Sequence, residues 1–99
     1  MATAGDYRIA WITLAAPQMC SGCGVGLIPT GRRALRFEKG QGVQRLHGRW
    51  FHGLSCLARC AELSAEEEDD RSPGRGEPYR WLARWAQEQE RSHRAAGQI

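Results

Sequence analysis

The sequence lacks the features that mark membrane, secreted and nucleotide-binding proteins. No apolar run approaches the roughly 20 residues that a membrane-spanning helix needs, and residues 1–6 have neither a basic stretch nor a long apolar segment of the kind found in secretory signals. No glycine-rich loop ends in the Gly-Lys-Ser/Thr of a phosphate-binding loop. We therefore expect a cytoplasmic protein with no membrane partner, and the preference for arginine over lysine described next indicates one of bacterial type.

Lysine is almost absent, since 13 of the 14 basic residues are arginine and Lys39 is the other. Residues 1–60 carry eight basic and two acidic side chains, a net charge of +6. Residues 61–99 carry six arginines and nine acidic side chains, a net charge of −3, and the two parts sum to the overall +3. A basic first part favours a polyanionic partner, although arginines that only solvate a surface give the same composition.

The chain has four cysteines, and their spacing is the main functional signal. Cys20 and Cys23 are separated by two residues, and His52 and Cys56 follow after a gap of 28 residues. Thiolate sulfur and imidazole nitrogen are typical ligands of tetrahedral structural zinc. A histidine and a cysteine four residues apart lie on one face of a helical turn, and cytoplasmic thiols stay reduced. The pattern predicts a Zn2+ site made by Cys20, Cys23, His52 and Cys56 rather than disulfides.

Other ligand sets remain open. Cys60 follows Cys56 by four residues and can complete a four-cysteine site in which His52 is spare, and His47 is a further candidate. A catalytic zinc keeps an open coordination position and needs a nearby general base. No glutamate-bearing motif accompanies these ligands, so we expect a structural metal in a protein that is not an enzyme.

The segments around the ligands predict an α+β fold. Apolar and β-branched residues recur in patterns typical of strands, and glycine and proline mark the turns between them. The strands are expected at residues 7–14, 32–37 and 43–49, with a turn at 28–31 and a hairpin tip at 40–42. Helical spacing predicts one helix from about 53 to 68 and another from 79 to about 93.

An acidic run, residues 66–70, precedes a segment rich in glycine and proline, which is typical of a solvated linker. The expected organisation is a zinc finger at 1–65, a linker at 66–77, and a C-terminal helix and tail at 78–99. We expect this helix to dock on the finger and to bury Trp81 and Trp85; the alternative is that it binds a protein partner.

Taken together, these residues resemble the PARP-type zinc finger of poly(ADP-ribose) polymerases and of a nick-sensing eukaryotic DNA ligase. That family has the same long gap between its Cys-Cys and His-Cys pairs and an aromatic pair before the histidine. The resemblance covers residues 7–60, and the last gap is one residue longer here than in the family. The matching segments are Tyr7-Arg8-Ile9, Cys20-Ser21-Gly22-Cys23, Ile28-Pro29-x-Gly31 and Arg49-Trp50-Phe51-His52.

The resemblance implies a small antiparallel sheet and a helix held by zinc, which bind DNA at its backbone, breaks or ends. Phosphate contacts give affinity without reading sequence, so the selection would be for DNA structure. In the family an apolar loop touches exposed bases, and it corresponds here to Val43 and Leu46. The predicted DNA-contacting residues are Arg32, Arg33, Arg36, Lys39, Val43, Arg45, Leu46 and Arg49.

A protein with this activity would associate with the nucleoid. The alternative is a protein-interaction adaptor of LIM-like or treble-clef-like type, which uses the same zinc scaffold and presents Trp81, Trp85 and the acidic segment to a partner.

Overall fold

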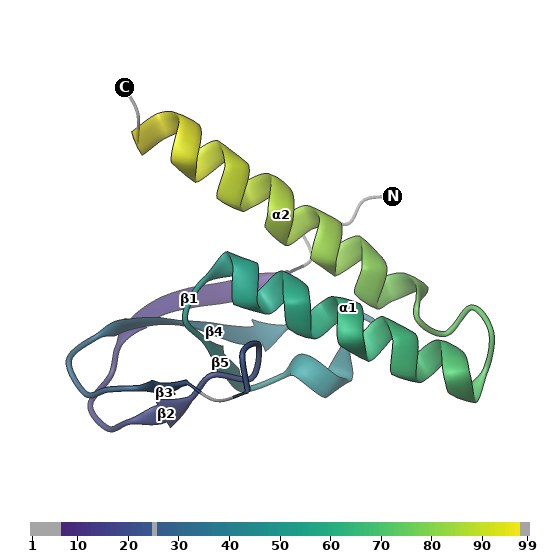
Figure 1. Ribbon diagram of the computed structural model, residues 1–99, viewed down its shortest axis with the longest axis horizontal. Coiled ribbons are helices and arrows are strands. Elements are labelled where there is room, and N and C mark those ends of the chain that lie inside the picture. Colours follow the sequence, from purple (N-terminus) through teal and green to yellow (C-terminus); the bar gives the residue numbers. More distant parts are fainter. Residues whose placement is uncertain (1–6, 25, 98–99) are drawn as a thin grey trace.

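The computed structural model describes residues 7–24 and 26–97, and it has an antiparallel sheet covered on one side by two helices (Figure 1). The three-stranded sheet has the order β1-β4-β5, and β2 and β3 form a separate two-stranded hairpin. The predicted α+β class is confirmed. The elements are β1 (Arg8–Thr13), β2 (Gln18–Met19), β3 (Leu27–Ile28), β4 (Arg33–Lys39), the 3-10 helix η2 (Gln44–Leu46), β5 (Arg49–Phe51), α1 (Leu54–Arg71) and α2 (Glu77–Gly97).

One row of opposed residues marks the face of the sheet that meets the core. Trp11 of β1, Leu35 of β4 and Phe51 of β5 are partners across the sheet, and opposed residues of antiparallel strands share a face. Leu35 and Phe51 are completely buried, in the same hydrophobic core as Leu57 of α1 and Leu82 of α2. The helices therefore cover this face.

The neighbouring row carries the opposite face. Ala10, Arg36 and Trp50 are partners across the same three strands. Because side chains alternate between the two faces of a sheet, this row points away from the helices. Arg36 and Trp50 are both half-buried, and the guanidinium carbon of Arg36 lies 5.5 Å from the centroid of the Trp50 ring.

After a short loop, the helix α2 runs back beside α1 (Figure 1). Leu82 and Ala86 are fully buried in the core, so the expected docking of this helix is seen. The two tryptophans of α2 differ from one another. Trp85 is half-buried, with its ring centroid 5.1 Å from that of Tyr7, whereas Trp81 remains 48% exposed. The expectation that both would be buried is therefore wrong for Trp81.

The acidic run is the end of a helix and not a linker, because α1 continues to Arg71 and only residues 72–76 connect it to α2. Glu68 is 7% exposed, and its carboxylate accepts hydrogen bonds from Arg45 at 2.9 Å and from Arg75 at 3.1 Å. These two guanidinium partners make a buried glutamate tolerable. The prediction of a solvated linker that begins at residue 66 is wrong for this physical reason.

The predicted strand at 43–49 is also wrong. A 3-10 helix occupies its centre, and β5 begins only at Arg49. Val43 and Leu46 are both fully buried. Residues three apart lie on the same side of a 3-10 turn, whereas in a strand they would point to opposite faces. Gly48, with φ of +78°, then turns the chain into β5 in a conformation that glycine adopts without strain.

Among the described residues, neither helix carries an apolar stretch of the length and hydropathy needed to cross a bilayer.

Candidate metal centre

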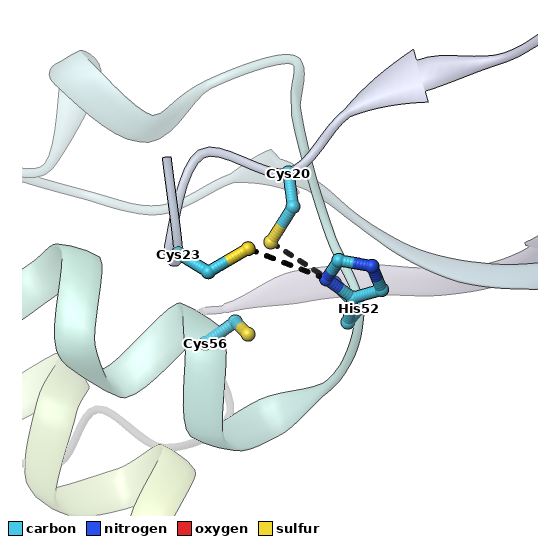
Figure 2. A group of neighbouring side chains, drawn as sticks. All are labelled: Cys20, Cys23, His52 and Cys56. Atoms are coloured by element: carbon cyan, nitrogen blue, oxygen red, sulfur yellow. Dashed lines mark hydrogen bonds between the residues drawn. The ribbon is translucent and has the colours of Figure 1, made fainter. Parts of the chain in front are cut away.

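Cys20 and Cys23 lie in the tight loop that joins β2 to β3. The Gly24 N–H donates to the Cys20 carbonyl at 3.2 Å, and the Cys20 N–H donates to the Gly26 carbonyl at 3.0 Å. Gly24 has a φ of +74°, a backbone conformation in which a residue with a side chain would be strained. The loop is thus a compact knuckle in which both thiols face the same side (Figure 2).

His52 and Cys56 come from the junction of β5 and α1. β5 ends at Phe51, Gly53 is the extended residue before the helix, and Cys56 lies in the first turn of α1. The knuckle is fastened to this junction by two backbone features. Cys20 forms an isolated β-bridge with Trp50, and the Ser21 N–H donates to the Trp50 carbonyl at 2.9 Å.

The four predicted ligands converge on one point (Figure 2). One donor atom of each, three Sγ and one imidazole nitrogen, lies within 4.8 Å of all the others. The Cys23 Sγ and His52 Nδ1 are 3.6 Å apart, which is the edge of a tetrahedron with a Zn–S bond of about 2.3 Å and a Zn–N bond of about 2.0 Å. The donor set, and the spacing of this donor pair, therefore fit a tetrahedral ion of the size and softness of Zn2+.

Two glycines make room for this arrangement. A Cβ on Gly22 would lie 2.2 Å from the Cys56 carbonyl oxygen, so a larger residue would separate the knuckle from α1. A Cβ on Gly26 would lie 2.5 Å from His52 Cε1 and 2.9 Å from the Cys23 Sγ. The sequence signal for this close packing is the glycine at every second position of residues 22–26.

The pKa values of the cysteine thiols indicate that a bound cation would stabilise the cluster. Burial raises the pKa of Cys20, but N–H donors from Cys23, His52 and Gly22 outweigh it and lower the pKa to about 6. The His52 N–H, for example, lies 3.4 Å from the Cys20 Sγ. Burial, a hydrogen bond to Cys20 and the negative charges of Cys20 and Cys23 raise the pKa of Cys56 to about 11. A divalent cation offsets this repulsion and favours all three thiolates.

The alternative ligands lie elsewhere among the described residues. Cys60 is outside the four-residue cluster, 8% exposed in α1, and burial raises the pKa of its thiol. The Nε2 atom of His47 contacts the backbone of Gly40 instead, 2.9 Å from its carbonyl oxygen and 3.1 Å from its amide nitrogen.

The predicted DNA contacts fall into separate groups. Val43 and Leu46 are fully buried, so neither can touch a base, and this prediction is corrected. Arg45 has a 34%-exposed side chain and forms salt bridges with Glu67 and Glu68. Its guanidinium is therefore not free for a phosphate.

The remaining predicted arginines lie on β4, β5 and the loop before β4. Arg49 donates to the Arg45 carbonyl at 2.6 Å and to Ser21 Oγ at 3.4 Å. Arg33 and Arg36 lie on opposite faces of β4, and each guanidinium carbon lies over a tryptophan, 5.8 Å from the Trp11 ring centroid for Arg33. Arg32 and Lys39 are exposed.

Comparisons with known proteins give no relative, since no family model, no curated protein and no solved structure matches the chain. The arrangement of Cys20, Cys23, His52 and Cys56 is therefore the observation from which a function must be argued.

Proposed function

We propose that this protein is a zinc-stabilised, non-catalytic DNA-binding module. The convergence of three cysteines and one histidine, with donor atoms within 4.8 Å of one another, is the observation that carries the proposal. Four protein ligands close the coordination sphere, as in structural zinc sites, and leave no position for a substrate. The role of the metal is then to hold the β2–β3 knuckle against the start of α1.

The charges of the sheet layer support DNA as the ligand. Arg45, Arg75 and Arg80 are neutralised by carboxylates of α1. By contrast, Arg32 and Arg36 form no salt bridge with any residue in the described ranges. Unpaired guanidinium groups release condensed counterions when they meet phosphates, which gives affinity for a nucleic-acid backbone without sequence preference.

The resemblance to PARP-type fingers favours DNA breaks and DNA ends as the structures that this protein binds. In this chain the residues that contact bases must differ from Val43 and Leu46, because both belong to the core. The half-buried Trp50 and the 38%-exposed Trp11 are aromatic groups beside the strand arginines that a base can reach.

The test is fluorescence anisotropy of zinc-loaded protein with nicked, blunt-ended and end-blocked duplexes over a salt series. We expect binding that weakens with salt, with a logarithmic slope of about −3 if three arginines contact phosphate. Arg32→Gln should reduce this slope by about 1, whereas Arg45→Gln should not, because Arg45 is already paired with Glu67 and Glu68. Absence of binding to every duplex at low salt would refute the DNA-binding role.

A protein partner is the second candidate, and one observation favours it. Met19 and Leu27 oppose one another on the β2–β3 hairpin and are 55% and 56% exposed. Trp81 of α2 is also 48% exposed, as the adaptor hypothesis requires. Failure to bind DNA would make this candidate the better one, and a Met19→Ser/Leu27→Ser double variant that lost a protein partner while it kept its zinc would establish it.

A further inference from the structure

The face of the sheet that turns away from the helices has an unusual composition. Its central row is Ala10, Arg36 and Trp50, and Ile12 and Ala34 form the next row on the same face. Ala34 is fully buried, whereas Ala10, Ile12, Arg36 and Trp50 are half-buried. The central row therefore reaches solvent with one guanidinium and one large aromatic ring.

Arg36 is held on this surface without a counterion. Its guanidinium carbon lies 5.5 Å from the centroid of the Trp50 ring, within the range of a cation–π interaction. Its Nε is buried and has no hydrogen-bond partner. No carboxylate of residues 7–24 or 26–97 forms a salt bridge with it. A partly dehydrated cation without a carboxylate partner gains more from an anion that reaches its terminal nitrogens than a fully solvated cation does.

We propose that this surface, formed by Ala10, Arg36 and Trp50, binds an unpaired nucleotide of a single-stranded nucleic acid. The base stacks on the outer plane of the Arg36 guanidinium, which Trp50 supports from beneath, and a flanking phosphate accepts hydrogen bonds from the terminal nitrogens of Arg36. This inference rests on the proposed function and specifies which nucleic acid the protein prefers.

Stacking chemistry explains why a single strand fits this surface better than a duplex. Bases splayed out of a helix stack on aromatic side chains and on arginine planes, and every base has a π-face, so the binding is tolerant of sequence. The bases inside an intact duplex are already stacked and paired. A duplex would therefore contact Arg36 only through phosphate.

Arg49 is next to Trp50 in sequence but does not belong to this surface. It opposes Phe37 across the sheet, on the face that the helices cover. Arg36 is therefore the arginine that this surface offers to a nucleic-acid backbone.

The test compares oligo(dT), oligo(U) and a blunt duplex of equal length in anisotropy titrations at one salt concentration. Wild-type protein is expected to bind at least one single strand about tenfold more tightly than the duplex, and the two oligonucleotides show whether DNA or RNA is preferred. Arg36→Lys keeps the charge but removes the planar group, so we expect the single-strand affinity to fall about tenfold and the duplex affinity to stay unchanged.

Arg71→Gln is the charge control, because Arg71 is exposed at the far end of α1. This variant should lower neither the single-strand affinity nor the duplex affinity. Zinc content and circular dichroism show whether each variant is folded. Photocrosslinking of a bromodeoxyuridine strand gives an independent measurement and should label the peptide that contains Trp50.

The outcomes separate the two proposals. Tighter single-strand binding that Arg36→Lys abolishes supports the inference. Equal binding of single strand and duplex, or an equal loss of both in Arg36→Lys, overturns the inference while the DNA-binding function stands. If no nucleic acid binds, the proposed function fails and the inference fails with it.

Discussion

The substitution Gly26→Ala should damage the metal centre without touching a ligand. The new Cβ would lie 2.5 Å from His52 Cε1 and 2.9 Å from the Cys23 Sγ, whereas ordinary contact begins at 3.4 Å. The imidazole ring must therefore retreat by 0.9 Å, the difference between 3.4 and 2.5 Å. Metal–ligand distances tolerate only about 0.2 Å. Loss of ligand positioning of this kind lowers metal affinity by about 10- to 100-fold.

The assay is competition for zinc against a chromogenic chelator, at neutral pH and with reduced thiols. Gly53→Ala is the matched control, because Gly53 is adjacent to His52 but its Cβ would meet nothing nearer than a Trp11 ring carbon at 3.8 Å. The control precedes α1 and costs at most about 1 kcal/mol of stability, with no change in zinc affinity. An unchanged affinity in Gly26→Ala, or an equal loss in Gly53→Ala, would show that the described packing of the site is wrong.

The remaining predictions concern ligand choice, pH and the core. Cys56→Ser should abolish stoichiometric zinc binding measured by elemental analysis, whereas Cys60→Ser should keep one zinc per chain, because only Cys56 belongs to the cluster. Burial raises the pKa of Glu68, but hydrogen bonds from its arginine partners outweigh it and hold the pKa below its ordinary 4.5. Its stabilisation is therefore full above that value and lost as the pH falls through the folded-state pKa. The difference in melting temperature between wild type and Glu68→Gln should shrink between neutral pH and about pH 3, and a constant difference would contradict this. Leu57→Ala should cost about 2–5 kcal/mol in denaturant unfolding, whereas Leu63→Ala, at a 51%-exposed position, should cost less than about 0.5 kcal/mol.

The convergence of the four ligands could be predicted from sequence because it depends on local geometry at each end. Two cysteines in a short glycine-containing loop reach one point. His52 and Cys56 are close in sequence, although His52 lies before α1 and not on its face as the helical spacing predicted. The site then depends on one long-range contact, the β-bridge between Cys20 and Trp50, which places the knuckle beside β5. The choice of Cys56 over Cys60 depends on the direction in which α1 leaves the site, and spacing alone does not give this direction.

Other parts of the fold could not be predicted because tertiary contacts decide them. The alternation of residues 43–49 fits a strand as well as a turn, and the burial of both Val43 and Leu46 is known only once α1 is in place. In the same way, an acidic run normally predicts exposure. Glu68 becomes buried because Arg45 and Arg75, from two other parts of the chain, meet at its carboxylate.

The division of charge between the layers also gives the molecule an electric dipole moment. Residues 1–60, which include the whole sheet, carry +6, and residues 61–97, most of which belong to α1 and α2, carry −3. A torque therefore acts on the protein in the field of any polyanion and turns its sheet toward the charge before contact. A larger fraction of encounters then begins in the binding orientation than for an evenly charged protein of the same net +3, and added salt should slow association by screening this alignment.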